Sequence, residues 1–80
     1  MKARVIVTLK SGILDPQGKA IEGALKSLGV VGVASVRAGK VFDIEIEGPD
    51  RKHAAAALKQ AADKLLANTL IENYDVKLIG

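Results

Sequence analysis

Apolar and polar residues alternate in three stretches of the chain, and this period of two predicts strands with one buried face. The first stretch covers residues 3–10, ARVIVTLK, and the last covers residues 74–78, YDVKL. Between them, residues 40–47, KVFDIEIE, place Phe42, Ile44 and Ile46 on one face. A β-branched run at residues 30–37, VVGVASVR, predicts a further strand, and the Gly-containing turn after it predicts a β-hairpin with residues 40–47.

Helical spacing follows the first strand, where apolar residues recur on one face of a helix. They are Ala20, Ile21, Ala24, Leu25 and Leu28. Asp15 is suited to cap this helix, Pro16 to occupy its first position and Gly29 to end it in a left-handed conformation. Gly18 in the first turn leaves two interpretations open, relaxed selection or the close approach of a backbone or a partner.

A second helix is predicted from a cap at Asp50 to about Asn68. Its apolar stripe continues at helical spacing through about four turns. The stripe consists of Ala54, Ala57, Leu58, Ala61, Ala62, Leu65 and Leu66. The spacing therefore predicts that these residues, Leu65 included, pack against the sheet.

The element order is βαββαβ, which predicts an α+β protein with the ferredoxin-like fold. Two interleaved right-handed crossovers give a two-layer sandwich, with a four-stranded antiparallel sheet in the order 4-1-3-2 and two helices on one face. Residues 1–80 form a single domain. The two open edges and the uncovered sheet face predict association into a dimer.

The composition excludes several classes of function but does not by itself indicate one. The 80 residues include no cysteine, one Phe and one Tyr, and the net charge is +3 with the basic residues scattered. A core this small favours oligomerisation. No apolar run is long enough to span a membrane and no secretion signal precedes the first strand, so a cytoplasmic location without membrane contact is expected.

No arrangement of residues indicates catalysis or metal binding. His53 is the only histidine, no cysteine can join it, and Asp43, Glu45 and Glu47 fit a solvated or partner-facing strand better than a cation site. RNA binding by this fold depends on two or three stacking aromatics on the central strands, where the chain offers only Phe42, on the same face as Ile44 and Ile46. We therefore expect no catalytic, cofactor-binding or metal-binding residue and no nucleic-acid partner. A dimeric small-molecule-binding regulatory module of the ACT kind stays open as the alternative function.

Three segments resemble the PurS subunit of phosphoribosylformylglycinamidine synthase. They are VTLKSGILDPQGKAIEGALKSLG at residues 7–29, VRAGK at 36–40 and LLANTLIENYDV at 65–76, in the family's order and spacing. The most specific part is LKSGILDPQG, at the first strand-to-helix turn. Thr69 departs from the family, which usually has proline after the asparagine, and this loosens the loop before the last strand.

The resemblance implies a dimeric, ferredoxin-like subunit without catalytic residues of its own, and a dimer of dimers stays open. It implies a complex with a glutaminase subunit (PurQ) and a large synthetase subunit (PurL) in purine biosynthesis. That complex is a C–N ligase with glutamine as amide donor. It converts formylglycinamide ribonucleotide (FGAR) to formylglycinamidine ribonucleotide (FGAM), and the partner synthetase, not this chain, uses ATP and Mg. The small subunit bridges the two others and supports ammonia transfer.

The subunit contacts are predicted to lie in three regions. The first is the loop with apolar side chains at the start of the first helix, the second is the tip of the predicted hairpin, and the third is the loop before the last strand. The residues are Ile13, Leu14, Asp15, Gln17, Gly18, Arg37, Gly39, Lys40, Asn68, Leu70 and Ile71.

Overall fold

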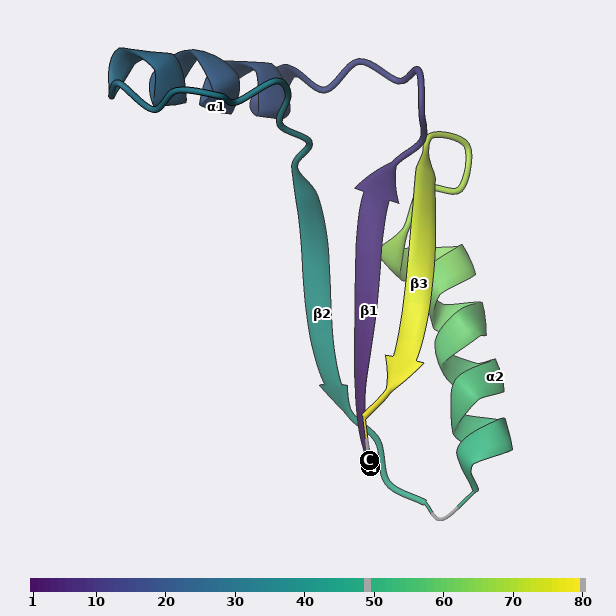
Figure 1. Ribbon diagram of the computed structural model, residues 1–80. Coiled ribbons are helices and arrows are strands. Elements are labelled where there is room, and N and C mark those ends of the chain that lie inside the picture. Colours follow the sequence, from purple (N-terminus) through teal and green to yellow (C-terminus); the bar gives the residue numbers. More distant parts are fainter. Residues whose placement is uncertain (49, 80) are drawn as a thin grey trace.

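The computed structural model describes residues 1–48 and 50–79, and its centre is a three-stranded antiparallel sheet (Figure 1). Strand β1 (Lys2–Leu9) lies between β2 (Gly39–Glu45) and β3 (Glu72–Leu78). Ala3 pairs with Ile44 on one side and with Leu78 on the other. The predicted order of these three strands and their antiparallel pairing are confirmed.

The predicted fourth strand is absent from the described residues. Residues 30–38 form no strand, so the predicted four-stranded sheet and the predicted hairpin are wrong for the single chain. Two of their backbone amides bond to side chains of the preceding helix instead of to a strand. Val36 N–H donates to Glu22 Oε1 at 2.8 Å and Ala38 N–H donates to Asp15 Oδ2 at 2.7 Å.

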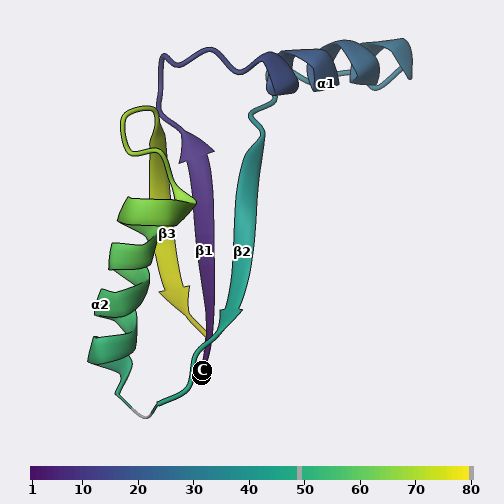
Figure 2. The ribbon, with the colours of Figure 1, turned by 180° about the vertical axis from the view of Figure 1, so that it is seen from behind.

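Helix α1 (Pro16–Ser27) projects away from the sheet together with residues 30–38, and the views from both sides agree on this (Figures 1 and 2). The predicted placement of both helices on one sheet face is therefore wrong for the single chain. We call residues 12–38 the arm. The arm makes the molecule elongated, with extents of 49 × 26 × 15 Å.

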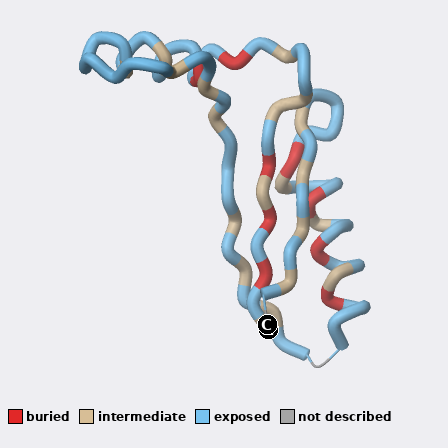
Figure 3. Tube along the Cα trace, in the orientation of Figure 1, coloured by how far each residue is buried: buried red, intermediate tan, exposed pale blue. Residues whose placement is uncertain are grey.

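Helix α2 (Arg51–Ala61) runs along the sheet, and its predicted cap is confirmed, because the Asp50 carboxylate accepts from the N–H groups of Lys52 and His53. Ala54, Leu58 and Ala62 are buried on its sheet-facing side, as the stripe predicts, whereas Ala57 is exposed and its predicted packing against the sheet is wrong. The buried core extends along β1 at Ala3, Val5 and Val7 (Figure 3). Alanine at two of the helix positions lets the helix approach the sheet closely.

The helix continues into a wider π turn, η1 (Ala62–Leu66), closed by a hydrogen bond from Ala67 N–H to the carbonyl of Ala62 at 2.9 Å. The extra residue in this turn rotates the apolar stripe. Leu66 consequently packs against the core, whereas Leu65 is 80% exposed. The prediction that Leu65 lies in the core is wrong.

Candidate subunit-contact surface

The three predicted contact regions meet at one end of the sheet, where β1 ends and β3 begins (Figure 1). Lys10 N–H donates to the carbonyl of Ile71 at 2.8 Å, which joins the first loop to the loop before β3. Residues 30–38, the part of the arm after α1, form what we call the return segment. Arg37 joins this segment to the first loop, because its guanidinium donates to the carbonyls of Ile13 at 2.9 Å and Lys10 at 3.1 Å. Segments far apart in sequence thus form one surface.

Asp15 organises the base of the arm. Its carboxylate is buried and accepts from Gly18 N–H at 2.9 Å and from Ala38 N–H at 2.7 Å. The first bond is the predicted helix cap, and Gly29 at the other end has the predicted left-handed φ of +80°. The second bond ties residue 38 to the start of α1. Asp15 therefore fixes where the arm's two halves sit relative to each other.

Gly18 is buried beside Asp15, and the structure decides between the two interpretations of this glycine. A Cβ there would overlap the carbonyl oxygen of Val36 and would lie 2.7 Å from Asp15 Oδ2. The close approach is therefore that of the chain's own return segment. Gly39 is constrained similarly, because its Cβ would lie 2.7 Å from the carbonyl oxygen of Val7.

Arg37, Asp15, Gly18 and Gly39 thus have roles within the chain that account for their residue types. Arg37 does not sit at a hairpin tip, since no hairpin forms. For these four residues, direct contact with another subunit stays a prediction.

The other predicted contact residues present their side chains outward. Leu14, Gln17, Lys40, Asn68, Leu70 and Ile71 are exposed and Ile13 is half-buried. Leu70 is 85% exposed, in a loop that Asn68 stabilises. The Oδ1 atom of Asn68 accepts from Leu70 N–H, and the backbone N–H of Asn68 donates to Glu72 Oε1 at 2.7 Å. An ordered loop that exposes a leucine fits a contact with another protein. The loop is braced despite Thr69.

Glu22 is a structural residue that the sequence reasoning missed. It accepts from Val36 N–H and lies 3.4 Å from Lys19 Nζ. Its position four residues after Gly18 and three before Leu25 places it on the face of α1 that the return segment covers. In the sequence, an acidic residue on that helix face is the feature that could have indicated a contact with a backbone N–H group.

The hydrogen bonds that the Asp15 and Glu22 carboxylates accept predict that the arm becomes less stable in acid. The hydrogen bond from Gly18 N–H, followed by that from Ala38 N–H, lowers the pKa of Asp15, and the hydrogen bond from Val36 N–H lowers the pKa of Glu22. Because the folded state lowers both pKa values, the ionised carboxylates stabilise these contacts above the ordinary pKa values of 3.8 for Asp15 and 4.5 for Glu22. This stabilisation is lost as the pH falls through the lowered pKa values. Amide shifts of Val36 and Ala38, followed by NMR from pH 6 to about pH 2, should move only at the acid end.

Glu22→Gln is the control for this titration. The glutamine oxygen can still accept from Val36 N–H but does not titrate, so the acid step at Val36 should disappear while the step at Ala38 remains. An unchanged step at Val36 would contradict the assignment.

The described residues contain no cluster of three side chains of the metal-binding types, and none of their helices is long and apolar enough to cross a membrane.

Comparison with known proteins shows the family of the chain. Residues 2–80 match the family model described as PurS, phosphoribosylformylglycinamidine (FGAM) synthase. The chain is 46% identical to the phosphoribosylformylglycinamidine synthase subunit PurS of Synechocystis, over 89% of this chain and 71% of that protein. It is 45% identical to the PurS subunit of Bacillus subtilis, over 91% of this chain and 86% of that one.

Solved structures of the family share the shape. The structure of B. subtilis PurS matches with a TM-score of 0.86 at 42% identity, over 99% of this chain and 98% of that chain. A chain in the structure of PurLQS from Thermotoga maritima matches with a TM-score of 0.89 at 31% identity, over 98% and 95% of the two chains. The arm is about a third of the 80 residues, so scores this high require a similarly placed arm in the relatives. The chain belongs to the PurS family of FGAM synthase subunits.

Proposed function

We propose that the chain is the small, non-catalytic subunit of a cytoplasmic FGAM synthase complex, and that it bridges the glutaminase subunit PurQ and the synthetase subunit PurL. Membership of the PurS family carries the proposal. The T. maritima relative belongs to a PurLQS structure, which supports the same partners here. In this proposal the synthetase uses ATP and Mg to convert FGAR to FGAM. The present chain contributes contacts that hold the ammonia path between its partners.

The exposed end of the sheet supports this role, and Leu70 tests it. Leu70→Asp should weaken binding of the chain to the glutaminase and synthetase subunits at least about tenfold, because burying the new charge is costly. Sedimentation velocity of the mixed subunits measures this. Leu65→Asp is the control, since it makes the same change at another exposed leucine, which lies in η1 and outside the predicted contact residues. Equal binding by both variants would remove Leu70 from the interface.

The shape of the chain supports a homodimer as the bridging unit. The radius of gyration is 15.9 Å, whereas a compact domain of this length has roughly 12 Å. Within residues 12–38 only Asp15 and Gly18 are buried, so the arm has no apolar core of its own. Ile21, Leu28 and Val30 are exposed, and Val31 is 91% exposed. An arm with this composition is stable only when another surface covers it.

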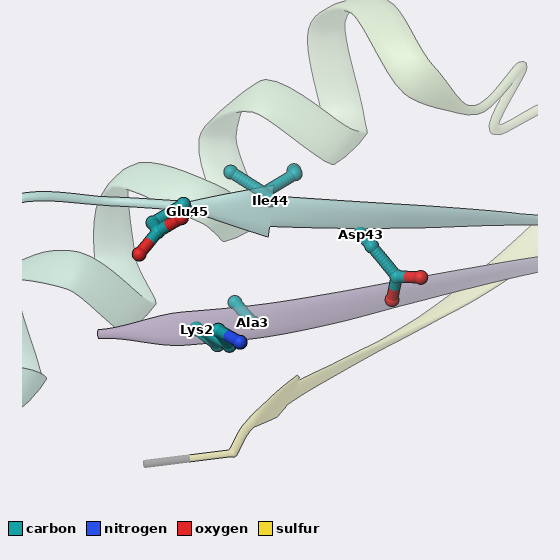
Figure 4. A pocket seen from close by; sticks show the side chains of 5 residues that line it. All are labelled: Lys2, Ala3, Asp43, Ile44 and Glu45. Carbon is teal, nitrogen blue, oxygen red and sulfur yellow. The ribbon is translucent and has the colours of Figure 1, made fainter.

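A second copy of the chain offers a matching surface on the β2 side of its sheet. Phe42 and Ile44 there are only half-buried, and β2 pairs with β1 alone, so its outer edge is open. Figure 4 shows Ile44 beside a pocket of 280 Å³ that Ala3 of β1 also lines. In the predicted ferredoxin-like order, this is the side where the missing strand belongs. We infer that each copy's arm packs against the β2 side of the other copy.

Val31→Asp tests the exchange of arms. The substitution should shift the dimer towards monomer, with a dissociation constant raised at least about tenfold, because a charge would enter an apolar interface. Analytical ultracentrifugation across a concentration series measures the shift, and Leu65→Asp again serves as control. If the unsubstituted chain sediments as a monomer at micromolar concentration, the dimer is wrong.

A further inference from the structure

The outer edge of β3 is the second open edge of the sheet, opposite the β2 side that the proposed dimer uses. Ile79 N–H donates to the carbonyl of Lys2 at 2.7 Å, and Lys10 N–H donates to the carbonyl of Ile71 at 2.8 Å. In an antiparallel pair, alternate residues bond to the neighbouring strand, so the intervening residues turn their backbone groups outward. Tyr74, Val76 and Leu78 therefore present unpaired N–H and C=O groups along a seven-residue strand.

A groove of 490 Å³ runs beside this edge, between β3 and α2. Arg51, Ala55 and Lys59 line it from α2, and their spacing of four places them on one helix face. The side chains of Tyr74, Val76 and Leu78 line the opposite wall and are half-buried. The wall formed by these β3 side chains is thus largely apolar. The wall formed by α2 carries the small side chain of Ala55 between the cations Arg51 and Lys59.

The two cations have no carboxylate partner among the described residues. The ion pairs there are Arg4–Asp43, Lys19–Glu22 and Lys77–Asp75, and none includes Arg51 or Lys59. Asp75 is the one acidic residue that lines the groove, and its Oδ2 lies 3.9 Å from Lys77 Nζ. The lining residues therefore carry a net charge of +1, which favours an acidic occupant, and Asp63 lies against the side chain of Tyr74.

Natural proteins commonly protect an open sheet edge with proline, bulges or charged side chains, lysine above all. The sequence of β3, ENYDVKL, carries Asp75 and Lys77 but no proline, and its pairing with β1 is regular from Ala3↔Leu78 to Leu9↔Glu72. An edge left regular beside a cationic groove fits the addition of a strand from another chain, in which backbone bonds supply affinity and alternate side chains enter the groove.

We propose that the β3 edge and the groove beside it receive an extended acidic segment of one of the two partner subunits, which adds to the sheet as a strand. This inference rests on the proposed function, because it names the surface through which the bridging subunit takes one partner. It separates the β3 edge, used between different subunits, from the arm and the β2 side, used between copies of this chain.

Charge reversal in the groove tests the proposal. Arg51→Glu/Lys59→Glu should weaken binding to the partner subunits at least about tenfold at low salt, since it replaces attraction by repulsion. The matched control is Lys52→Glu/Lys64→Glu, which makes the same change in net charge at exposed positions that do not line the groove. Circular dichroism confirms that both variants are folded. Similar binding by the two variants would overturn the proposal.

Hydrogen exchange distinguishes strand addition from other contacts. The outward amides of Tyr74, Val76 and Leu78 should become protected when the partner subunits are added to the full chain, and protection should be lost in Arg51→Glu/Lys59→Glu. Protection in the chain alone that grows with its concentration would assign the edge to a second copy and overturn the proposal. Protection by RNA in place of the subunits would overturn it as well. If the unsubstituted chain binds neither subunit, the proposed function fails; if it binds them with unprotected β3 amides, only this inference fails.

Discussion

Replacement of Leu58 by alanine is expected to lower the free energy of unfolding by about 2–5 kcal/mol. Leu58 is 4% exposed, on the face of α2 that packs on the sheet. Its truncation removes apolar contact and leaves a cavity beside the short side chains of Ala54 and Ala62, which cannot fill it. An 80-residue domain has roughly 4–12 kcal/mol of stability in total, so this loss is a large share.

Leu65→Ala is the matched control, because it makes the same chemical change at a leucine that lies within the π turn. Leu65 is 80% exposed, so the free energy of unfolding should change by no more than about 0.5 kcal/mol. Urea denaturation followed by circular dichroism measures both values. Equal losses for the two variants would show that the π turn does not direct Leu65 outward.

Gly18→Ala is expected to destabilise the protein by about 1–3 kcal/mol, although alanine is the better helix former. The new methyl group would meet the carbonyl oxygen of Val36 and the Asp15 carboxylate, so the return segment has to move away from α1. The hydrogen bonds from Ala38 to Asp15 and from Val36 to Glu22 would lengthen with it. We therefore expect loss of dimer as well as of stability.

Gly23→Ala provides the opposite result in the same helix. A Cβ at Gly23 meets nothing within 4 Å, so the substitution should stabilise the protein by about 0.5–1 kcal/mol through helix propensity. Thermal unfolding at one protein concentration compares the two variants. A neutral Gly18→Ala would mean that the return segment does not lie against the helix as described.

The strands with strict alternation and the two helices could be predicted from the sequence, because burial of one face imposes the period directly. The caps were equally readable, since Asp15 and Asp50 bond to amides two or three residues away. These features depend on neighbours in the chain, which a single sequence contains.

The position of the arm could not be predicted in the same way. The β-branched run at residues 30–37 indicates that its side chains become buried, but periodicity does not say against which chain. In one copy these residues pair with no strand, and Val36 and Ala38 bond to carboxylates instead. In the proposed exchange of arms, a second molecule completes the predicted sandwich.

The π turn escaped prediction for a different reason. No glycine or proline interrupts Ala62–Leu66, so the helical stripe continues without a visible break and assigns Leu65 inward. The predicted contact residues were chosen by residue type, yet Arg37 and Gly39 serve the chain's own packing. The cations Arg51 and Lys59 could not be recognised as lining a groove, because β3 lies far from them in sequence.

The central claim, that this chain bridges two catalytic partners, is tested most directly by measuring FGAM formation with two nitrogen sources. The synthetase and glutaminase subunits are assayed with and without the chain, first with glutamine and then with ammonia. We expect omission of the chain to abolish turnover with glutamine but to leave turnover with ammonia largely intact. Turnover with glutamine that is equally fast without the chain would contradict this claim.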